Sequence, residues 1–301
     1  MALLAWLMMT LGAFVRATQS GLGCPDWPAC HGRLLAGGHH ALIEEAHRWV
    51  GTVLVIGLVG LAAVVLRRYR RERSVVVPTL CALGLLFAQV VMGGITVLLK
   101  NVAWTVVGHF ACAALLVASI ALVAVRLAYP RSEPVPADRF VKLVWWFAGL
   151  TFGLLMAGST LANAGSDTAC GSGFPLCNGA LFPAISHNVA IAYIHRIWAG
   201  AMLLFAAWVH VRARRDRPSA APIVRVSGLV LLLFLIQAVA GAVIVSVVDD
   251  HASEVIHSSL GSLTWLTVAT LLALARTLPA AEAALARSAP ADALSAVPAR
   301  I

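Results

Sequence analysis

The stretch that decides the fold is Glu44-Glu45-Ala46-His47-Arg48-Trp49-Val50-Gly51, which leads into an apolar run ending at Leu66. It places carboxylates, an imidazole and a guanidinium at the start of a segment apolar enough to cross a membrane. A similar stretch, Tyr193-Ile194-His195-Arg196-Ile197-Trp198-Ala199-Gly200, lies 148 residues further along the chain. The two stretches indicate an internal repeat.

The same offset of 148 residues relates three further pairs of identical residues: Gln89 with Gln237, Gly93 with Gly241 and His109 with His257. Identity at several chemically distinctive positions predicts two homologous halves, each built from four helices. Two of the repeated histidines fall in each half, so the repeat predicts two histidine pairs.

The composition indicates a membrane protein. Of the 301 residues, 60% are hydrophobic and only 12% are charged, which argues against a water-soluble fold. A helix needs about 20 mostly apolar residues to cross the bilayer. Eight runs qualify, at 1–15, 48–66, 76–99, 104–126, 140–163, 189–211, 223–248 and 255–275. The predicted fold is an all-α polytopic membrane protein with eight transmembrane helices in two four-helix bundles. The short first run has no cleavage site after it and is interpreted as a helix, not as a secretion signal.

The basic residues indicate how the helices cross the membrane. Most of the 22 lysines and arginines fall in alternate connections, within 67–73, 126–142 and 212–225, and in the C-terminal segment. By the positive-inside rule these connections and both termini face the cytoplasm, an N-in and C-in arrangement. An even number of helices in each half places the pseudo-twofold axis along the membrane normal. This distribution accounts for the net charge of +9 without a nucleic-acid partner.

These patterns divide the chain into four parts. Residues 1–130 are expected to form the N-terminal four-helix bundle, 131–139 a cytoplasmic linker and 140–278 the C-terminal four-helix bundle. Residues 279–301 are rich in alanine, proline and serine, and are expected to be a disordered cytoplasmic tail.

Two cysteine pairs lie in the loops expected to face outward. Cys24 and Cys30 are separated by five residues, and Cys170 and Cys177 by six. Disulfides persist on the oxidising side of the membrane, so one disulfide is expected in each loop. Such a bond could clip the loop over the helix ends or form a redox-active pair that relays electrons. Free thiols are the third alternative.

The four repeated histidines are expected at similar depth near the outward ends of their helices. A lone histidine there is an ordinary interfacial residue, but four at matched depth indicate a site. Neutral imidazole is a common metal ligand, and imidazoles on facing helices can bind an iron from opposite sides. Zinc normally takes three or four protein ligands, so two imidazoles suit haem better. Two haem sites are predicted, one held by His47 with His109 and one held by His195 with His257.

Arginine and glutamine accompany the histidines in both halves. Arg48 and Arg196 each follow a histidine, and could pair with haem propionates or snorkel from a helix end. Gln89 and Gln237 are isolated polar residues in apolar runs. A close helix contact with an amide hydrogen bond is the favoured interpretation of these glutamines, and a hydrogen bond to a bound macrocycle is the alternative.

An acidic residue distinguishes the two halves. Glu44 precedes His47 by three residues, which places both on one helix face, whereas the corresponding position of the second half is Ala192. The difference predicts that the first half performs chemistry and that the second holds a permanent cofactor. The alternative is that Glu44 and Glu45 are solvated loop residues.

A second acidic residue weakens this contrast. Glu254 stands three residues before His257. It is expected to form a solvated acidic cluster with Asp249 and Asp250.

With these residues in view, the sequence resembles the haem A synthases, membrane enzymes that oxidise a methyl group of haem O to the formyl group of haem A. The resemblance covers about residues 10–275. Its most specific part is the first loop, which matches the bacterial type with paired loop cysteines at Arg16, Thr18, Ser20-Gly21-Leu22, Cys24-Pro25-Asp26-Trp27-Pro28 and Cys30. The signature Glu-x-x-His-Arg and the other ligand positions are matched by Glu44, His47, Arg48, His109, His195-Arg196 and His257.

The resemblance implies a role for each residue of the site. His195 and His257 would ligate a bound haem b in the C-terminal half. His47 and His109 would line the haem O pocket of the N-terminal half, with Glu44 beside the C8 methyl that is oxidised. The paired cysteines would form a redox-active disulfide, Cys24–Cys30, and its structural counterpart, Cys170–Cys177.

The resemblance also implies a setting. The protein would be a multi-pass protein of the bacterial cytoplasmic membrane, with haem O as substrate and the lipid bilayer as surroundings. Haem O synthase, and a quinone or thiol–disulfide redox partner, are further partners that it suggests, and a homo-oligomer is compatible with it.

Other functions would use the residues differently. A di-haem b electron-transfer protein that oxidises quinol would need the four histidines, but neither Glu44 nor the cysteine loop. A transporter built from two repeats would concentrate polar groups near the membrane midplane, whereas this chain concentrates them at one edge. A haem O synthase would need aspartate pairs to bind magnesium diphosphate, and the sequence contains no Asp-x-x-Asp cluster.

Overall fold

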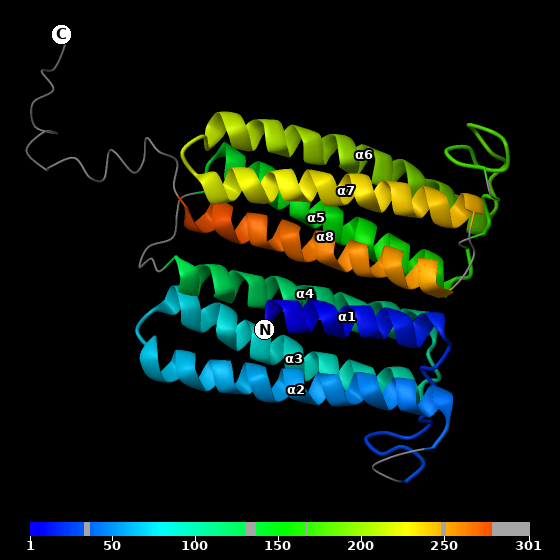
Figure 1. The fold of residues 1–301 in the computed structure, drawn as a ribbon, viewed down its shortest axis with the longest axis horizontal. Helices are drawn as coiled ribbons and strands as arrows, with labels where there is room; N and C mark the ends of the chain where they lie inside the picture. Colours follow the sequence, from blue (N-terminus) through cyan, green and yellow to red (C-terminus); the bar gives the residue numbers. More distant parts are fainter. Residues whose placement is uncertain (33–36, 130–136, 167, 172, 248–250, 279–301) are drawn as a thin grey trace, which may run out of the picture.

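A computed structural model describes residues 1–32, 37–129, 137–166, 168–171, 173–247 and 251–278. Over these residues every regular element is an α-helix (Figure 1). The eight helices are α1 (Ala2–Ala17), α2 (His39–Arg68), α3 (Arg73–Leu98), α4 (Ala103–Ala128), α5 (Arg139–Asn163), α6 (His187–Asp216), α7 (Ala221–Val247) and α8 (His251–Thr277). The predicted all-α fold with eight helices is confirmed. The proposed tail 279–301, most of the linker, and Asp249 and Asp250 lie outside the described residues.

The start of α2 differs from the prediction in an informative way. Helix α2 begins at His39, whereas the hydropathy pattern predicted a start at residue 48. The polar opening of α2 includes Glu44 and Glu45, which are buried within the protein, and hydropathy does not detect such burial. Helix α1 has 16 residues and is therefore about 24 Å long. The other seven helices are long and apolar enough to cross a membrane.

The helices form two groups of four (Figure 1). In the first group α1 contacts α2, α2 contacts α3, α3 contacts α4, and α4 contacts α1. In the second group α5, α6, α7 and α8 form a similar ring. Among the described residues, α2 does not contact α4 and α6 does not contact α8. These two helix pairs therefore lie diagonally across the interior of their bundles.

The two bundles meet along α8, which contacts both α1 and α4. Two tryptophans form hydrogen bonds across this boundary. The indole N–H of Trp265 in α8 donates to the carbonyl of Ala114 in α4 at 2.7 Å, and that of Trp6 in α1 donates to the carbonyl of Ser259 in α8 at 3.0 Å. Trp265 is buried and its ring also lies 5.5 Å from that of Phe152. These contacts fix the positions of the bundles relative to each other.

The two ends of the molecule differ in chemistry. Both cysteine loops, between α1 and α2 and between α5 and α6, project from one end (Figure 1). At the opposite end Arg217 forms an ion pair with Asp138, the N-cap residue of α5. Partial burial raises the pKa of Asp138, but hydrogen bonds from Val141 and Arg217 outweigh this effect and hold its pKa below the usual 3.8.

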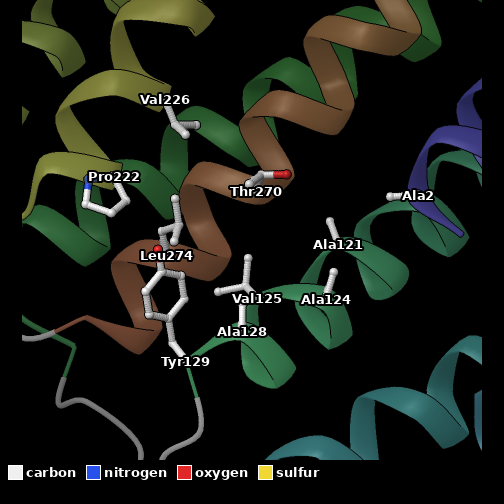
Figure 2. A pocket seen from close by; sticks show the side chains of 10 residues that line it. All are labelled: Ala2, Ala121, Ala124, Val125, Ala128, Tyr129, Pro222, Val226, Thr270 and Leu274. Carbon is white, nitrogen blue, oxygen red and sulfur yellow. The ribbon is translucent and has the colours of Figure 1, made fainter.

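An apolar pocket of about 340 Å³ also lies toward this opposite end (Figure 2). It is lined by Ala2, Ala121, Ala124, Val125, Ala128, Tyr129, Pro222, Val226, Thr270 and Leu274. Tyr129 and Thr270 supply the only polar side chains of this lining, and none of the four repeated histidines belongs to it. The pocket is therefore not the candidate site.

The tryptophan bond between the bundles gives a first prediction. Trp265→Phe removes the donor to Ala114 and leaves space where the larger ring packed, so the free energy of unfolding should fall by about 2 kcal/mol. Trp146→Phe is the matched control, because Trp146 is 72% exposed on the bundle surface. In that variant the free energy of unfolding should change by less than about 0.5 kcal/mol. Reversible unfolding in mixed micelles measures both variants. Equal stability of the two variants would contradict the assigned role of Trp265.

Candidate functional site

The four repeated histidines occupy equivalent positions in the two bundles. His47 and His195 are each the ninth residue of their helices, α2 and α6, and His109 and His257 are each the seventh residue of α4 and α8. All four helices begin at the end that carries the cysteine loops (Figure 1). His47 and His109 are close enough to interact electrostatically, as are His195 and His257. Each bundle therefore brings one histidine pair together from its two diagonal helices.

Each imidazole is seated against a glycine of the preceding helix. A Cβ atom added to that glycine would lie 3.0–3.2 Å from the imidazole Cε1 atom. The four contacts join Gly12 to His47, Gly93 to His109, Gly158 to His195 and Gly241 to His257. Since the spacing is too short for an ordinary side-chain contact, the glycines are needed to place the imidazoles at this depth.

The two glutamines lie beside the second histidine of each pair. The amide nitrogen of Gln89 lies 3.1 Å from Nε2 of His109, and that of Gln237 lies 3.2 Å from Nε2 of His257. Gln237 also donates to the backbone carbonyl of His257 at 3.0 Å. The favoured interpretation, an amide hydrogen bond at a close helix contact, is the arrangement found.

The unsatisfied nitrogen atoms of the histidines fit a metalloporphyrin site. In all four imidazoles Nδ1 is buried and finds no hydrogen-bond partner within the described residues. Buried polar atoms are normally paired, so unpaired ones at a repeated position indicate a ligand. In the described part of the chain, the only cluster of three potential ligand residues is Cys24, Cys30 and Glu45. No third ligand accompanies either histidine pair there, which fits a haem iron held by two imidazoles better than a zinc site.

Glu44 and Arg48 are bound to the first cysteine loop. Glu44 is 4% exposed, so the alternative that it is a solvated loop residue is wrong, and the same holds for Glu45 at 5%. One oxygen of Glu44 accepts the backbone N–H of Cys24 at 2.9 Å, and the other accepts Arg48 at 2.7 Å. Arg48 also donates to the carbonyl of Ala29 at 2.7 Å. The guanidinium is therefore engaged with the loop, and its pairing with a propionate stays a prediction.

The second half repeats the arginine but lacks the acid. Arg196 donates to the carbonyls of Leu176 and Gly173 at 2.7 and 3.1 Å, within the second cysteine loop. The equivalent of Glu44 is Ala192, which packs in an apolar cluster with Cys170 and Cys177. Arginine thus anchors both loops, and within the described residues a carboxylate of the following helix takes part in the first loop alone.

Glu254 has a different partner from the one expected. It forms an ion pair with Arg16 at the end of α1. Arg16 also donates to the carbonyl of Ala162 in α5 at 3.3 Å. The expectation of a solvated acidic cluster is wrong for Glu254, because an arginine from the other bundle reaches it. The remaining members of that cluster lie outside the described residues.

Both expected disulfides are present in the structure. Cys24 is bonded to Cys30, and Cys170 to Cys177. The first loop is further closed by Asp26, which accepts the backbone N–H groups of His31 and Gly32 at 2.6 and 2.8 Å. The hydrogen bond from Gly32, followed by that from His31, lowers the pKa of Asp26 from 3.8.

Sequence reasoning missed two of the four glycines. Gly93 and Gly241 follow the 148-residue offset, but Gly12 and Gly158 are 146 residues apart. A search at one fixed offset therefore could not pair Gly12 with Gly158. The signal that could find them is a glycine on the preceding helix at the depth of each histidine.

Fold and site together define a polytopic helical membrane protein with two diagonal histidine pairs, one per bundle. The chain belongs to the cytochrome oxidase assembly protein family, whose model matches residues 1–44 and 36–269. Among its relatives, a “Heme A synthase” of Symbiobacterium thermophilum is 28% identical over 88% of this chain and 91% of its own length. A protein of the same name from Halalkalibacterium halodurans is 25% identical over 87% of this chain and 90% of its own length. Another, from Bacillus pumilus, is 33% identical over 66% of this chain and 67% of its own length. The chain is a multi-pass bacterial membrane protein.

The Asp26 contacts predict how the first loop responds to pH. A carboxyl group with a lowered pKa stabilises the folded loop above its usual pKa, and this stabilisation is lost as the pH falls through the lowered value. Amide hydrogen exchange of His31 and Gly32, corrected for the intrinsic rate, should therefore be slow at neutral pH and accelerate only below pH 3.8. Asp26→Asn should accelerate exchange already at neutral pH. Unchanged protection in that variant would show that Asp26 does not hold the loop.

Proposed function

We propose that the protein is a haem A synthase, which oxidises the C8 methyl group of haem O to a formyl group. The observation that carries the proposal is the pair of diagonal histidine sites, of which, among the described residues, the first alone has a buried carboxylate three residues before a histidine. The names of the relatives support haem A biosynthesis as the pathway. The N-terminal half would bind haem O, and the C-terminal half would hold haem b.

The histidines would hold the two macrocycles. His195 and His257, which lie on the diagonal helices α6 and α8, would ligate the permanent haem b. His47 and His109 would bind haem O from α2 and α4. When bound, the haem b would supply a route for electrons to or from the substrate site. The glycine behind each imidazole lets the ring pack closely against the neighbouring helix, which would help to position it for a macrocycle.

Glu44 would supply the acid–base or electrostatic function of the N-terminal site. It lies three residues before His47 on α2, and the same carboxylate is fixed through both oxygens by Cys24 and Arg48. A carboxylate fixed in a buried environment can stabilise positive charge that develops at the methyl group, or orient the water that attacks it. Since Ala192 occupies the equivalent place, the C-terminal site lacks this group.

The setting of the site completes the proposal. The cysteine loops would face outward and both termini inward, as the distribution of basic residues predicts. Arg48 and Arg196 would pair with the haem propionates at the aqueous rim. Four further points stay predictions. They are the domain division into 1–130 and 140–278, a redox partner for the first loop, haem O synthase as a neighbour, and a homo-oligomer.

Haem analysis of purified variants tests the proposal. The protein is expressed with a source of haem O, and the extracted haems are identified by absorption and mass spectrometry. The unaltered protein should yield haem b and haem A. His195→Ala and His257→Ala should lose haem b, because each removes one axial ligand. Glu44→Gln should keep both pigments but convert at least about 100-fold less haem O.

Glu72→Gln is the matched control for Glu44→Gln, because Glu72 lies at the opposite end of the helices, just before α3. It should convert haem O normally. Normal haem A yield from Glu44→Gln would defeat the role assigned to Glu44. Two unmodified haem b molecules per chain, without haem A, would instead support a di-haem electron-transfer protein.

The glycine contacts give a separate prediction. Gly241→Ala should displace the imidazole of His257, because the new Cβ atom would lie 3.0 Å from Cε1. The haem b content of the purified protein should fall several-fold, as judged by its absorption per mole of protein. Gly84→Ala is the control, since a Cβ atom there would meet nothing within 4 Å. Equal haem content in the two variants would show that the close contact does not position the ligand.

A further inference from the structure

The first cysteine loop and Glu44 share one network of hydrogen bonds. The backbone N–H of Cys24 donates to Glu44, and Arg48 donates both to Glu44 and to loop carbonyls. These carbonyls belong to Ala29 at 2.7 Å, Asp26 at 3.1 Å, Cys24 at 3.3 Å and Pro28 at 3.4 Å. The position of the carboxylate therefore depends on the conformation of the loop backbone.

The disulfide lies within this network. Cys24 and Cys30 are 0% and 2% exposed, and a carboxylate oxygen of Glu45 lies within 4.8 Å of both sulfur atoms. On the other side of Cys24, Gly23 packs so closely on α2 that an added Cβ atom would lie 2.5 Å from the carbonyl of His40. Cys24 is thus held between the disulfide and the start of α2, with its N–H directed to Glu44.

The loop also contacts the helix that cradles the second histidine. The indole ring of Trp27 packs on Gly94 of α3, where an added Cβ atom would lie 3.0 Å from the ring. Gly94 is adjacent to Gly93, the residue against which His109 is seated. The loop therefore contacts α2 near His47 and α3 near His109, and covers the end of the N-terminal pair.

The second loop has the disulfide without this connection. Its backbone is closed on itself, since the N–H of Asn178 donates to the carbonyl of Cys170 at 2.9 Å. Arg196 anchors it through backbone carbonyls. At the positions of Glu44 and Glu45 the second half has Ala192 and Tyr193, so α6 offers this loop no carboxylate at either position.

We propose that the Cys24–Cys30 disulfide is energetically coupled to Glu44, so that its oxidised form holds the carboxylate in place and its reduced form releases it. Cys24 and Arg48 act as positioning residues, and the Cys170–Cys177 disulfide has no such coupling. The proposal rests on the proposed function in one respect, the catalytic role of Glu44. The bonds that carry it involve this chain alone.

The reduction step is an exchange with an external dithiol. The dithiol supplies two electrons and two protons and becomes a disulfide, while the Cys24–Cys30 bond breaks to give two thiols. Breaking the bond between these two cysteines, which are six positions apart in the sequence, restores conformational freedom to the loop that joins them. The Cys24 N–H then no longer has a fixed direction toward Glu44.

Thermodynamic linkage makes the coupling measurable. If the oxidised loop favours the bound carboxylate, the bound carboxylate favours the oxidised loop by the same factor. A hydrogen bond to a charged group is worth roughly tenfold or more in an equilibrium constant. Removing the charge of Glu44 should therefore make Cys24–Cys30 easier to reduce.

The experiment equilibrates the full-length protein in detergent with dithiothreitol of graded redox state. Free thiols are then alkylated, and the reduced fraction of each cysteine pair is quantified by peptide mass spectrometry. Glu44→Gln should raise the equilibrium constant for reduction of Cys24–Cys30 about tenfold, a shift of about 30 mV. Cys170–Cys177 in the same sample should not shift. Glu254→Gln, in which the acid bound to Arg16 is altered, should shift neither pair.

An unchanged Cys24–Cys30 equilibrium in Glu44→Gln, or an equal shift in both pairs, would overturn the proposal. Hydrogen exchange of the unaltered protein provides a second test that needs no variant. Reduction should accelerate exchange in residues 39–50 of α2 but not in residues 187–198 of α6, and equal changes in both segments would again contradict the coupling. Neither measurement requires bound haem, so a failed haem assay and a failed coupling are separate results.

Discussion

The structure depends on placing four imidazoles inside apolar helix bundles at one depth. Each ring is brought to its position by a glycine on the neighbouring helix, where a single methyl group would come within 3.0–3.2 Å of Cε1. Each ring also keeps a buried Nδ1 atom unpaired within the described residues. Burial of an unpaired polar atom is costly, and its repetition at four equivalent places is best explained by a ligand that the site is built to bind.

The duplication supplies the symmetry, and the loops supply the difference between the halves. Diagonal helices present one histidine pair in each bundle, and an arginine after the first histidine anchors a disulfide loop in both. In the described part of the chain the first loop alone also engages a helix carboxylate, Glu44, through the backbone of Cys24. The same scaffold can therefore hold a permanent cofactor in one half and carry out chemistry on a similar molecule in the other.

The sequence predicted those parts that depend on local pattern. Hydropathy identified the eight helices, the repeat identified the histidines and glutamines, and the position of the cysteines in two outward loops identified the disulfide pairs. The spacing of Glu44 and His47 placed both on one helix face, but hydropathy alone could not predict that α2 begins as early as His39 or that Glu44 and Glu45 are buried. Nor could it predict that Arg48 binds loop carbonyls or that Arg16 reaches Glu254, since both depend on how loops and bundles pack.

The central claim is that histidines from two diagonal helices ligate one iron. Its most direct test is electron–nuclear double resonance of the oxidised, purified protein, with histidine labelled by ¹⁵N. The account predicts a low-spin ferric signal coupled to nitrogen atoms of two labelled imidazoles. A high-spin signal, or coupling to one labelled imidazole or none, would contradict it.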